Sequence, residues 1–444
     1  MIFSVIGVLI LIYSCFNFKK GFLVYLLFQI IWFSNGKIIS MAGVPSIPIY
    51  LVMALSFAAI YILKGGFRAK LVEFPFMIPL LVLSISRVLT CFTSLEGFAS
   101  EFTRAIGFIF GSFIEVILIW RIVEKAKDFD FLMKGYCFIF TFASVYGLIE
   151  YMIKTNPIVE YKSMLTPEGI TTYQTDIFRG YRVMSLFEHP IGAGMTFGLF
   201  AVFAFLYWTN KKQKQSNFYI IIALLSILCV TLTKMRSSIL FTLIGMLAFV
   251  KLKNKKFYKI FFIAILGVLV AFPIYKDYVD VFLSLFSSTA QKSVGGSDSA
   301  MRFTQFETVL NIMKRSFLFG FGEQCASYLP KSLVANALGF ESIWFEAMSR
   351  YGIVGVMGNV IMMLYSVIFI PRKYKCKQAF WIALAYWLTN TLTSIPFFRM
   401  SMYYVVYFYC IKMSRVYQKE RNKCYVRPEQ KLLTLRNKFF NLKI

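Results

Sequence analysis

The sequence contains few of the residues that enzymes commonly use to bind metals or to transfer protons. Its 444 residues include one histidine, His189, and 21 acidic residues against 48 lysines and arginines. The eight cysteines are scattered, with no CxxC pair and no histidine at metal-ligand spacing, so neither a disulfide framework nor a zinc site is indicated. No metal and no cofactor is therefore predicted. The first apolar run has neither a basic segment before it nor a small-residue cleavage site, so no cleaved signal peptide is expected.

The chain has an excess of apolar sequence. Hydrophobic residues make up 58% of it and aromatic residues 18%. Apolar runs of about 17 to 25 residues recur, which is the length that crosses a bilayer as an α-helix, and the alternating ten-residue segments of a membrane barrel are missing. The predicted fold class is all-α, a polytopic membrane helix bundle of about 12 to 13 spans with a long, partly helical extracytoplasmic loop.

The apolar runs define thirteen candidate spans and the segments between them. The spans are residues 2–17, 21–35, 46–63, 71–91, 104–121, 131–153, 190–208, 217–233, 237–251, 257–275, 349–370, 378–394 and 398–413. We divide the chain into residues 1–276, with ten spans and an outer segment near residues 155–188, an extracytoplasmic catalytic loop of residues 277–348, the last spans within residues 349–413, and a basic cytoplasmic tail of residues 414–444.

The net charge of +27 would suggest nucleic acid as the partner of a soluble protein. In this chain the basic residues form short clusters after alternate spans, from Lys19 and Lys20 to the tail beyond Lys412. Such clusters mark cytoplasmic loops, so the long loop is predicted to lie outside and the tail to contact anionic lipid rather than nucleic acid. Asp128-Phe129-Asp130 imitates a metal-binding DxD motif, but it lies beside two lysines on the predicted cytoplasmic side, and we interpret it as a solvated loop.

The long loop carries an amphipathic segment. A helix is predicted from about Ala300 to Phe317, and one of its faces carries a stripe of apolar residues. The stripe consists of Phe303, Phe306, Leu310, Met313 and Phe317. It suits a helix that lies on the outer membrane surface or on the bundle, and glycines at both ends suggest a mobile lid. A second helix is predicted from Glu341 towards the span at Gly352.

Cations near the outer ends of the spans are the first functional candidates. They are Arg87, Arg182, Lys234, Arg236, Arg302 and Arg399. A cation in or near a span is costly unless it is paired or faces water, although long side chains also extend to lipid head groups. Several guanidinium groups at one depth would bind a polyanion at the membrane surface, most simply a lipid diphosphate. Glu341 and Glu188-His189 open helices on the same face. His189 is interpreted as a possible substrate contact or as a structural residue, and Glu341 as a base or a helix cap.

Five segments together resemble a known family. They are YRVMSLFEHPIGAG (181–194), TKMRSSILFTLIG (233–245), SDSAMRFTQFETVL (297–310), FLFGFGE (317–323) and FESIWFEAMSRYGIVG (340–355). In this order they resemble the O-antigen polymerase and ligase superfamily of bacterial membrane glycosyltransferases, over about the last 270 residues. The chain departs from the family pattern at Ser185, where a glycine is usual, and at Ile191, where an asparagine is usual. A glutamate at position 341 is more similar to the polymerases, since ligases tend to have a histidine there.

The resemblance implies a substrate, a location and a set of site residues. It implies polymerisation of polyprenyl-diphosphate-linked oligosaccharide repeat units of O-antigen or capsular polysaccharide at the outer face of the bacterial cytoplasmic membrane, with membrane lipids and a chain-length regulator as further partners. By this resemblance Arg182, Arg302 and Glu341 would be catalytic. Position near the outer ends of the spans, rather than the resemblance, selects the substrate-binding candidates, which are Arg87, Lys234, Arg236, His189 and Arg399. Arginines can stabilise a leaving diphosphate without a metal, and a carboxylate can act as the base for a sugar hydroxyl.

Three other functions remain open from the sequence. An O-antigen ligase would use the same substrate and similar residues. A flippase or other exporter of lipid-linked oligosaccharides would also be basic and polytopic, but it would need cations at mid-membrane depth and no large outer loop. In a non-enzymatic scaffold the set of arginines would be accidental.

Overall fold

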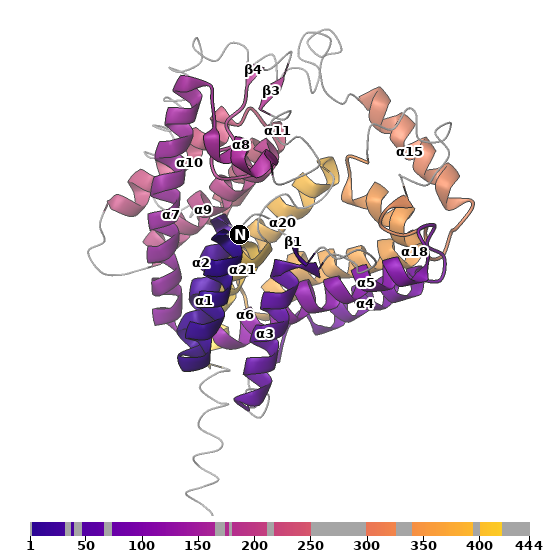
Figure 1. Ribbon diagram of the computed structural model, residues 1–444, viewed down its shortest axis with the longest axis horizontal. Helices are drawn as coiled ribbons and strands as arrows, with labels where there is room; N and C mark the ends of the chain where they lie inside the picture. The colour runs from indigo at the N-terminus through magenta and orange to yellow at the C-terminus, as the bar shows by residue number, and fades with distance from the viewer. Residues whose placement is uncertain are drawn as a thin grey trace, which may run out of the picture.

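The protein is described from a computed structural model, and it is almost entirely helical (Figure 1). The residues that the structure describes are 2–31, 37–39, 47–65, 73–164, 174–176, 180–210, 217–249, 299–325, 340–393 and 400–419. Only four short strands accompany the helices in this part of the chain, as two antiparallel pairs. They are β1 (Lys37–Ile39) with β2 (Ile47–Pro48), and β3 (Thr175–Asp176) with β4 (Gly180–Tyr181). The all-α prediction is therefore confirmed at the level of fold class.

Within the described residues, four helical segments are long and apolar enough to cross a membrane. Two are single helices, α7 (Ala126–Ile153) and α9 (Pro190–Asn210). The other two are composite and run over Phe98–Ile122 and Ile343–Lys373. The first consists of α5 (Phe98–Phe108), the π-helical turn η2 (Ile109–Phe113) and α6 (Ile114–Ile122), and the second of α18 (Ile343–Leu364), the π-helical turn η6 (Tyr365–Phe369) and α19 (Ile370–Lys373).

The other helices are shorter. They are α1 (Ile2–Phe16), α2 (Phe18–Ile31), α3 (Ile49–Leu63), α4 (Met77–Thr90), α8 (Pro157–Met164), α10 (Phe218–Leu232), α11 (Arg236–Met246) with the 3-10 turn η4 (Leu247–Phe249), α15 (Ser299–Met313), α20 (Lys377–Leu392) and α21 (Met400–Lys412). A helix of 15 residues is about 22 Å long, which is less than the ~30 Å hydrocarbon core. The predicted 12 to 13 spans are therefore not confirmed as a count. The candidate span at residues 257–275 lies outside the described residues.

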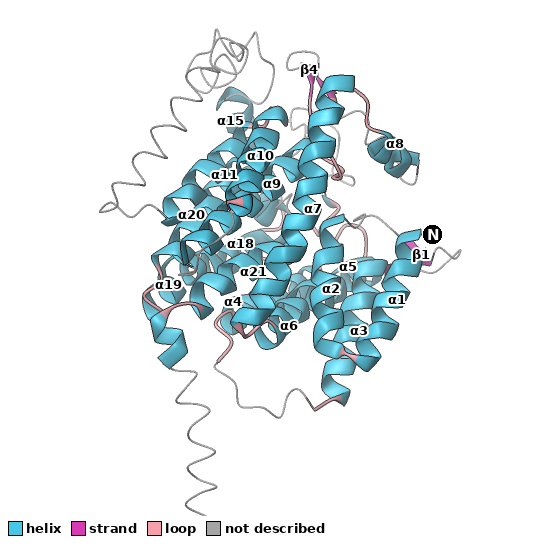
Figure 2. Cartoon of the chain, turned by 90° about the vertical axis from the view of Figure 1, so that its left-hand side faces the viewer, coloured by secondary structure: helices cyan, strands magenta, loops and turns pink. Residues whose placement is uncertain are grey.

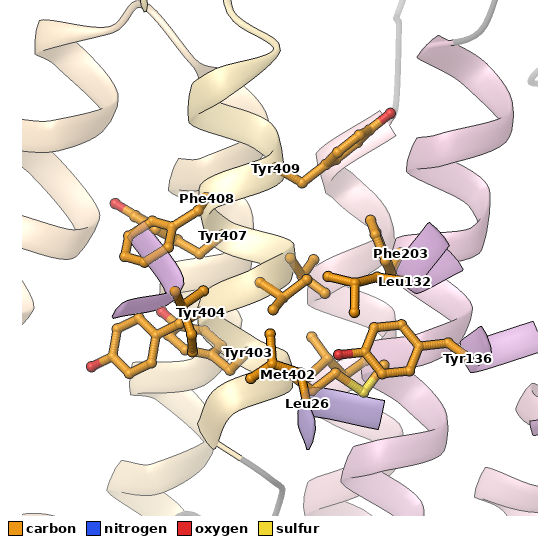
Figure 3. Close-up of a cluster of buried hydrophobic side chains, with 14 of the residues drawn as sticks. Leu26, Leu132, Tyr136, Phe203, Met402, Tyr403, Tyr404, Tyr407, Phe408 and Tyr409 are labelled. Carbon is orange, nitrogen blue, oxygen red and sulfur yellow. The ribbon is translucent and has the colours of Figure 1, made fainter. Parts of the chain in front are cut away.

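Helix α21 forms the centre of the hydrophobic core. All of its residues from Ser401 to Lys412 are buried. Figure 3 shows Tyr409 on the side of α21 that faces Leu132 of α7 and Phe203 of α9, with ring centres of Tyr409 and Phe203 5.3 Å apart. Tyr404, Tyr407 and Phe408 lie on the opposite side of the helix, where they contact Phe76. A helix that is apolar on all sides is expected in the interior of a bundle rather than on its surface. The bundle is thus organised around α21.

The interpretation of Asp128-Phe129-Asp130 as a solvated loop is wrong, because the three residues begin helix α7. Asp128 is only 6% exposed. Its Oδ2 accepts hydrogen bonds from the backbone of Glu124 (3.1 Å) and Lys125 (2.8 Å), and it lies 2.7 Å from Lys19 Nζ. An acidic side chain at this place satisfies amide groups that a helix start leaves unpaired and complements the helix dipole. The motif therefore has a structural explanation.

Helix α15 packs against the first half of α18, and Figure 1 shows it above α18. Its buried face carries Gln305, Val309 and Ile312. Of the predicted apolar stripe only Met313 is buried, and Phe303, Leu310 and Phe317 are exposed. Phe306 is 36% exposed, and the centre of its ring lies 5.9 Å from that of Phe345 on α18. Most of the stripe is thus exposed, which is the arrangement expected if it contacts lipid. The helix also ends at Met313 rather than at Phe317.

Residues 317–322 insert into a break in α18. The break is at Gly352, with φ 61° and ψ −158°, a region of backbone conformation that is essentially restricted to glycine. Ile353 N donates to Phe317 O (2.9 Å), and Phe321 N donates to Ser349 O (3.1 Å). These bonds join the chain after α15 to α18. Gly320, which we predicted as a hinge, is packed against the α18 backbone, because a Cβ there would lie 2.5 Å from Arg350 C.

We expect Gly352→Ala to lower the melting temperature of the detergent-solubilised protein strongly. A Cβ at this position would lie 2.6 Å from Leu318 C and O, and the strained backbone alone costs about 1–3 kcal/mol. Gly107→Ala is the matched control, because a Cβ there meets no neighbour within 4 Å and alanine favours a helix by about 0.5–1 kcal/mol. Equal melting temperatures for the two variants would show that the break in α18 does not support the fold.

Candidate functional site

Arg302 and Glu341 lie beside each other where three helices meet. Arg302 is on α15, and its Nη2 lies 4.0 Å from Glu341 Oε2, just before α18. The same Nη2 donates to Leu392 O at the end of α20 (3.0 Å). The side chains are 32% and 39% exposed, so the guanidinium and the carboxylate both reach solvent. Two residues that are 39 positions apart in the sequence therefore share one accessible site.

The first turn of α18 is capped by Ser342 and does not need the Glu341 side chain as its cap. Ser342 is the N-cap, and its side chain accepts from Trp344 N (3.3 Å). The backbone N of Glu341 donates to Gln305 Oε1 on α15 (3.3 Å), and Trp344 Nε1 donates to Thr391 on α20 (3.0 Å). Because a serine cap satisfies amide groups of the first turn, the start of α18 does not depend on the Glu341 carboxylate as a cap.

A second group of cations surrounds the turn between α10 and α11. It comprises Arg182, Lys234 and Arg236, and we call it the α9–α11 cation group. Arg182 Nη1 lies 3.8 Å from Met235 Sδ in that turn. Gly180 lies beside Lys234, because a Cβ placed on it would be 3.6 Å from Lys234 Nζ, and Arg236 is the first residue of α11. His189 lies near Arg182. Predicted residues from two separate segments are thus brought to one region.

The segment that carries Arg182 is fixed by a buried carboxylate. Glu150 on α7 accepts from Met184 N (3.0 Å) and Ser185 N (2.6 Å). Ser185 has φ 51°, in the left-handed region, which glycine adopts without strain. The family pattern has glycine at this position, and the structure gives the physical reason for that preference. Ser185 compensates with bonds of its own, because its hydroxyl donates to Ala143 O (2.7 Å).

His189 begins helix α9 as an N-cap. Its Nδ1 accepts from Ile191 N (3.1 Å), and Pro190 is the first helical residue, an arrangement that favours helix initiation. Burial, and next the charge of Arg182, lower the pKa of His189 to about 4. The imidazole is therefore neutral near pH 7, and protonation of Nδ1 would abolish the cap. The structure thus gives His189 a structural role, and its contact with substrate remains a prediction.

The two groups are linked through α20. Helix α11 packs along α20, and α20 in turn contacts α18. Figure 1 shows α20 between the helices α9 to α11 and the pair α15 and α18, and Figure 2 shows α15, β4 and α8 near one end of the molecule. The end of α20 binds Arg302, and the start of α11 carries Arg236. The cation group and the Arg302–Glu341 pair therefore lie on neighbouring helices.

Arg87 is not part of either group. Its Nη1 donates to Tyr351 Oη (2.6 Å) and lies 4.0 Å from Glu323 Oε2. The guanidinium also lies 4.0 Å from the centre of the Phe108 ring. These residues line a cavity of about 320 Å³. Arg399 lies outside the described residues.

Sequence reasoning missed four ionisable residues of that cavity. They are Glu115, Glu323, Glu346 and Arg350. Glu346 Oε1 and Arg350 Nη2 form an ion pair of 3.1 Å, four residues apart on α18. This pair could have been recognised from the sequence. A glutamate and an arginine four residues apart face each other on a helix, and ionisable residues inside an apolar run are functional candidates.

Comparison with known proteins supports the resemblance found in the sequence. Residues 221–360 match the model of a family described as O-antigen ligase, and this match supports the O-antigen polymerase and ligase superfamily. The matched region includes Lys234, Arg236, Arg302 and Glu341 and covers less than half of the chain. No curated protein matches the sequence. The protein thus has the apolar helices of a membrane protein, and its residues 221–360 are similar to the O-antigen ligase family.

Proposed function

We propose, from the O-antigen ligase match of residues 221–360, that this protein is a membrane glycosyltransferase. It polymerises polyprenyl-diphosphate-linked oligosaccharide repeat units of O-antigen or capsular polysaccharide. The reaction takes place at the outer face of the bacterial cytoplasmic membrane, a location supported by the alternation of basic clusters along the chain. A chain-length regulator is proposed as a further partner.

One observation carries the proposal: the Glu341 carboxylate and the Arg302 guanidinium lie 4.0 Å apart and are both partly exposed. The reaction needs a base next to a group that stabilises negative charge, because proton removal from the acceptor coincides with departure of a diphosphate. Glutamate and arginine have these properties. The α9–α11 cation group adds further positive charge on neighbouring helices, which suits the second phosphate.

The proposed step conserves atoms and charge. An oxygen of an acceptor hydroxyl forms a bond to the anomeric carbon of the donor glycan, and the bond from that carbon to the diphosphate oxygen breaks. Glu341 takes the hydroxyl proton, and polyprenyl diphosphate leaves with the bonding electron pair. Arg302 and Arg182 stabilise the charge that develops on it. Such preorganised donors act most strongly on charge that appears only in the transition state.

An O-antigen ligase is the second candidate, and the description of the matching family favours it. A ligase would transfer a finished glycan to a lipid-anchored core oligosaccharide, whereas a polymerase would add repeat units to one another. Both reactions break the same bond. The glutamate at position 341 favours the polymerase, because the ligases that this chain resembles tend to have a histidine there.

The test is an assay of the full chain in nanodiscs with purified lipid-linked repeat unit. We expect glycans of two or more repeat units, with polyprenyl diphosphate released in proportion to the bonds formed. A ligase would instead form a single product, and only when the core oligosaccharide is added. If neither product formed and, in sealed proteoliposomes, the protein carried the lipid-linked unit across the bilayer, the protein would be an exporter and the proposal would be wrong.

A further inference from the structure

The cavity beside Arg87 lies within the bundle. It is separate from the α9–α11 cation group and from the Arg302–Glu341 pair. Helices α4, α18, α20 and α21 enclose it together with the composite segment Phe98–Ile122. Its volume of about 320 Å³ is at the lower end of the range of small-molecule sites, about 300–1,000 Å³. Asn359, Ser86 and Ser112 add uncharged polar groups to its charged residues. A chamber of this kind suits one compact polar ligand.

Both π-helical turns of the described chain line this cavity. Gly111 and Ser112 come from η2, and Ser366 comes from η6. Ser366 is fixed on two sides, because its Oγ accepts from Trp387 Nε1 (2.8 Å) and its carbonyl accepts from Tyr407 Oη (2.6 Å). π-Helical turns are rare, interrupt the regular helix and occur mostly at functional sites. Two of them from distant parts of the chain indicate a built site rather than a packing gap.

The charges of the cavity argue against a phosphate ligand. Both of its arginines already have a carboxylate beside them, Arg350 at 3.1 Å from Glu346 and Arg87 at 4.0 Å from Glu323. A diphosphate would have to displace these carboxylates, at a large cost for charges that are partly buried. Sugar hydroxyls carry no charge, and they can donate to the carboxylates and accept from the guanidinium groups without breaking either pair.

Aromatic rings supply the second feature that a sugar ring requires. Tyr351, Tyr386 and Trp387 line the cavity, and such rings combine an apolar face with a polar group at the edge. A pyranose has C–H groups on its faces and hydroxyls around its rim. Aromatic faces beside paired charges match that distribution, whereas a polyprenyl chain would displace water from these charged groups and offer them no hydrogen bond, which is costly.

A continuous set of contacts joins the cavity to Glu341. Trp387 in the cavity wall stacks on Trp344, with ring centres 5.8 Å apart. Trp344 Nε1 donates to Thr391, the neighbour of Leu392, and Leu392 O binds Arg302. Ile343, two residues after Glu341, also lines the cavity. A sugar in the cavity would therefore be next to the helix start that presents the proposed base.

We propose that this cavity binds a neutral sugar ring of the acceptor glycan and so brings its hydroxyl towards Glu341. This proposal rests on the glycosyltransferase function proposed above. The proposal separates two tasks that the sequence analysis had assigned to one set of residues. The α9–α11 cation group and Arg302 bind the diphosphate of the donor, and the cavity binds the acceptor. Arg87 then contacts the acceptor rather than the diphosphate.

Two soluble probes distinguish these tasks with the full chain in nanodiscs. One is the oligosaccharide released by mild acid from the lipid-linked repeat unit, which has sugars but neither lipid nor diphosphate. The other is farnesyl diphosphate, which has no sugar. Saturation-transfer NMR measures their dissociation constants. We expect Glu346→Gln and Ser112→Phe each to weaken binding of the oligosaccharide at least tenfold and to leave farnesyl diphosphate unaffected.

Glu160→Gln is the matched control, because Glu160 is exposed on α8 and its loss should change neither constant. Unchanged farnesyl diphosphate binding also shows that the cavity variants are folded. The proposal is overturned if the oligosaccharide does not bind, if both cavity variants bind it normally, or if they lose farnesyl diphosphate instead, which would make the cavity a lipid site. Oligosaccharide binding to the cavity without any product in the glycan assay would leave the cavity site standing and would contradict the proposed function alone.

Discussion

Glu341→Gln is expected to bind the donor normally and to form no polymer. Glutamine keeps the size of the side chain and most of its hydrogen bonding, but it cannot take a proton from an acceptor hydroxyl. General base catalysis contributes roughly a hundredfold to ten-thousandfold to such rates, so the loss should be in turnover. The helix should survive the change, because Ser342 caps α18. Single-turnover rates with lipid-linked repeat unit, together with the dissociation constant of farnesyl diphosphate, measure the two effects separately.

Glu307→Gln provides the control for this variant. Glu307 is on α15, close in sequence to Arg302, and its side chain is exposed. Its loss should leave both the rate and the dissociation constant unchanged. If Glu341→Gln polymerised at a rate near that of the wild type, Glu341 would be a substrate contact, and the base would have to be found on His189 or on the acceptor itself.

Much of the fold could be predicted because lipid restricts the possible backbone structures. Apolar runs within a membrane must form helices that satisfy their own hydrogen bonds, and each run in the described part of the chain is a helix. The number of helices that cross the membrane completely was harder to predict. Hydropathy does not show where a helix breaks, as at Gly352 in α18, or that Phe98–Ile122 continues through a π-helical turn.

The candidate site could be predicted in part, because charged side chains are also costly in lipid. Costly cations near span ends mark candidates one by one, and this criterion found Arg302 and the cations around the α10–α11 turn. It could not show that Arg87 lies elsewhere, because its neighbour Tyr351 is 264 positions away in the sequence. The apolar stripe of α15 left two alternatives open. Periodicity shows that Phe303 and Phe306 share a face, but it does not show whether protein or lipid covers that face.

Arg302→Lys is expected to be nearly as inactive as Arg302→Ala, with normal expression. The Arg302 guanidinium donates to Leu392 O and is 4.0 Å from Glu341, and its planar fork leaves further donors for phosphate oxygens. A lysine has one compact, strongly hydrated charge and cannot serve the helix end and two phosphate oxygens together. Loss of a preorganised donor costs about 2.7–4 kcal/mol, or roughly a hundredfold to a thousandfold in rate.

Arg315→Lys is the matched control for this last prediction. Arg315 follows α15, and its side chain is exposed, so the same exchange should leave the rate unchanged. The assay is again polymer formed per unit time in nanodiscs, with thermal unfolding of each variant to verify the fold. A rate for Arg302→Lys within a few fold of the wild type would mean that positive charge alone is sufficient at this position. The diphosphate would then be held by the α9–α11 cation group, and Arg182→Lys would become the decisive variant. Arg182 lies on the segment whose backbone Glu150 holds by accepting from Met184 N and Ser185 N.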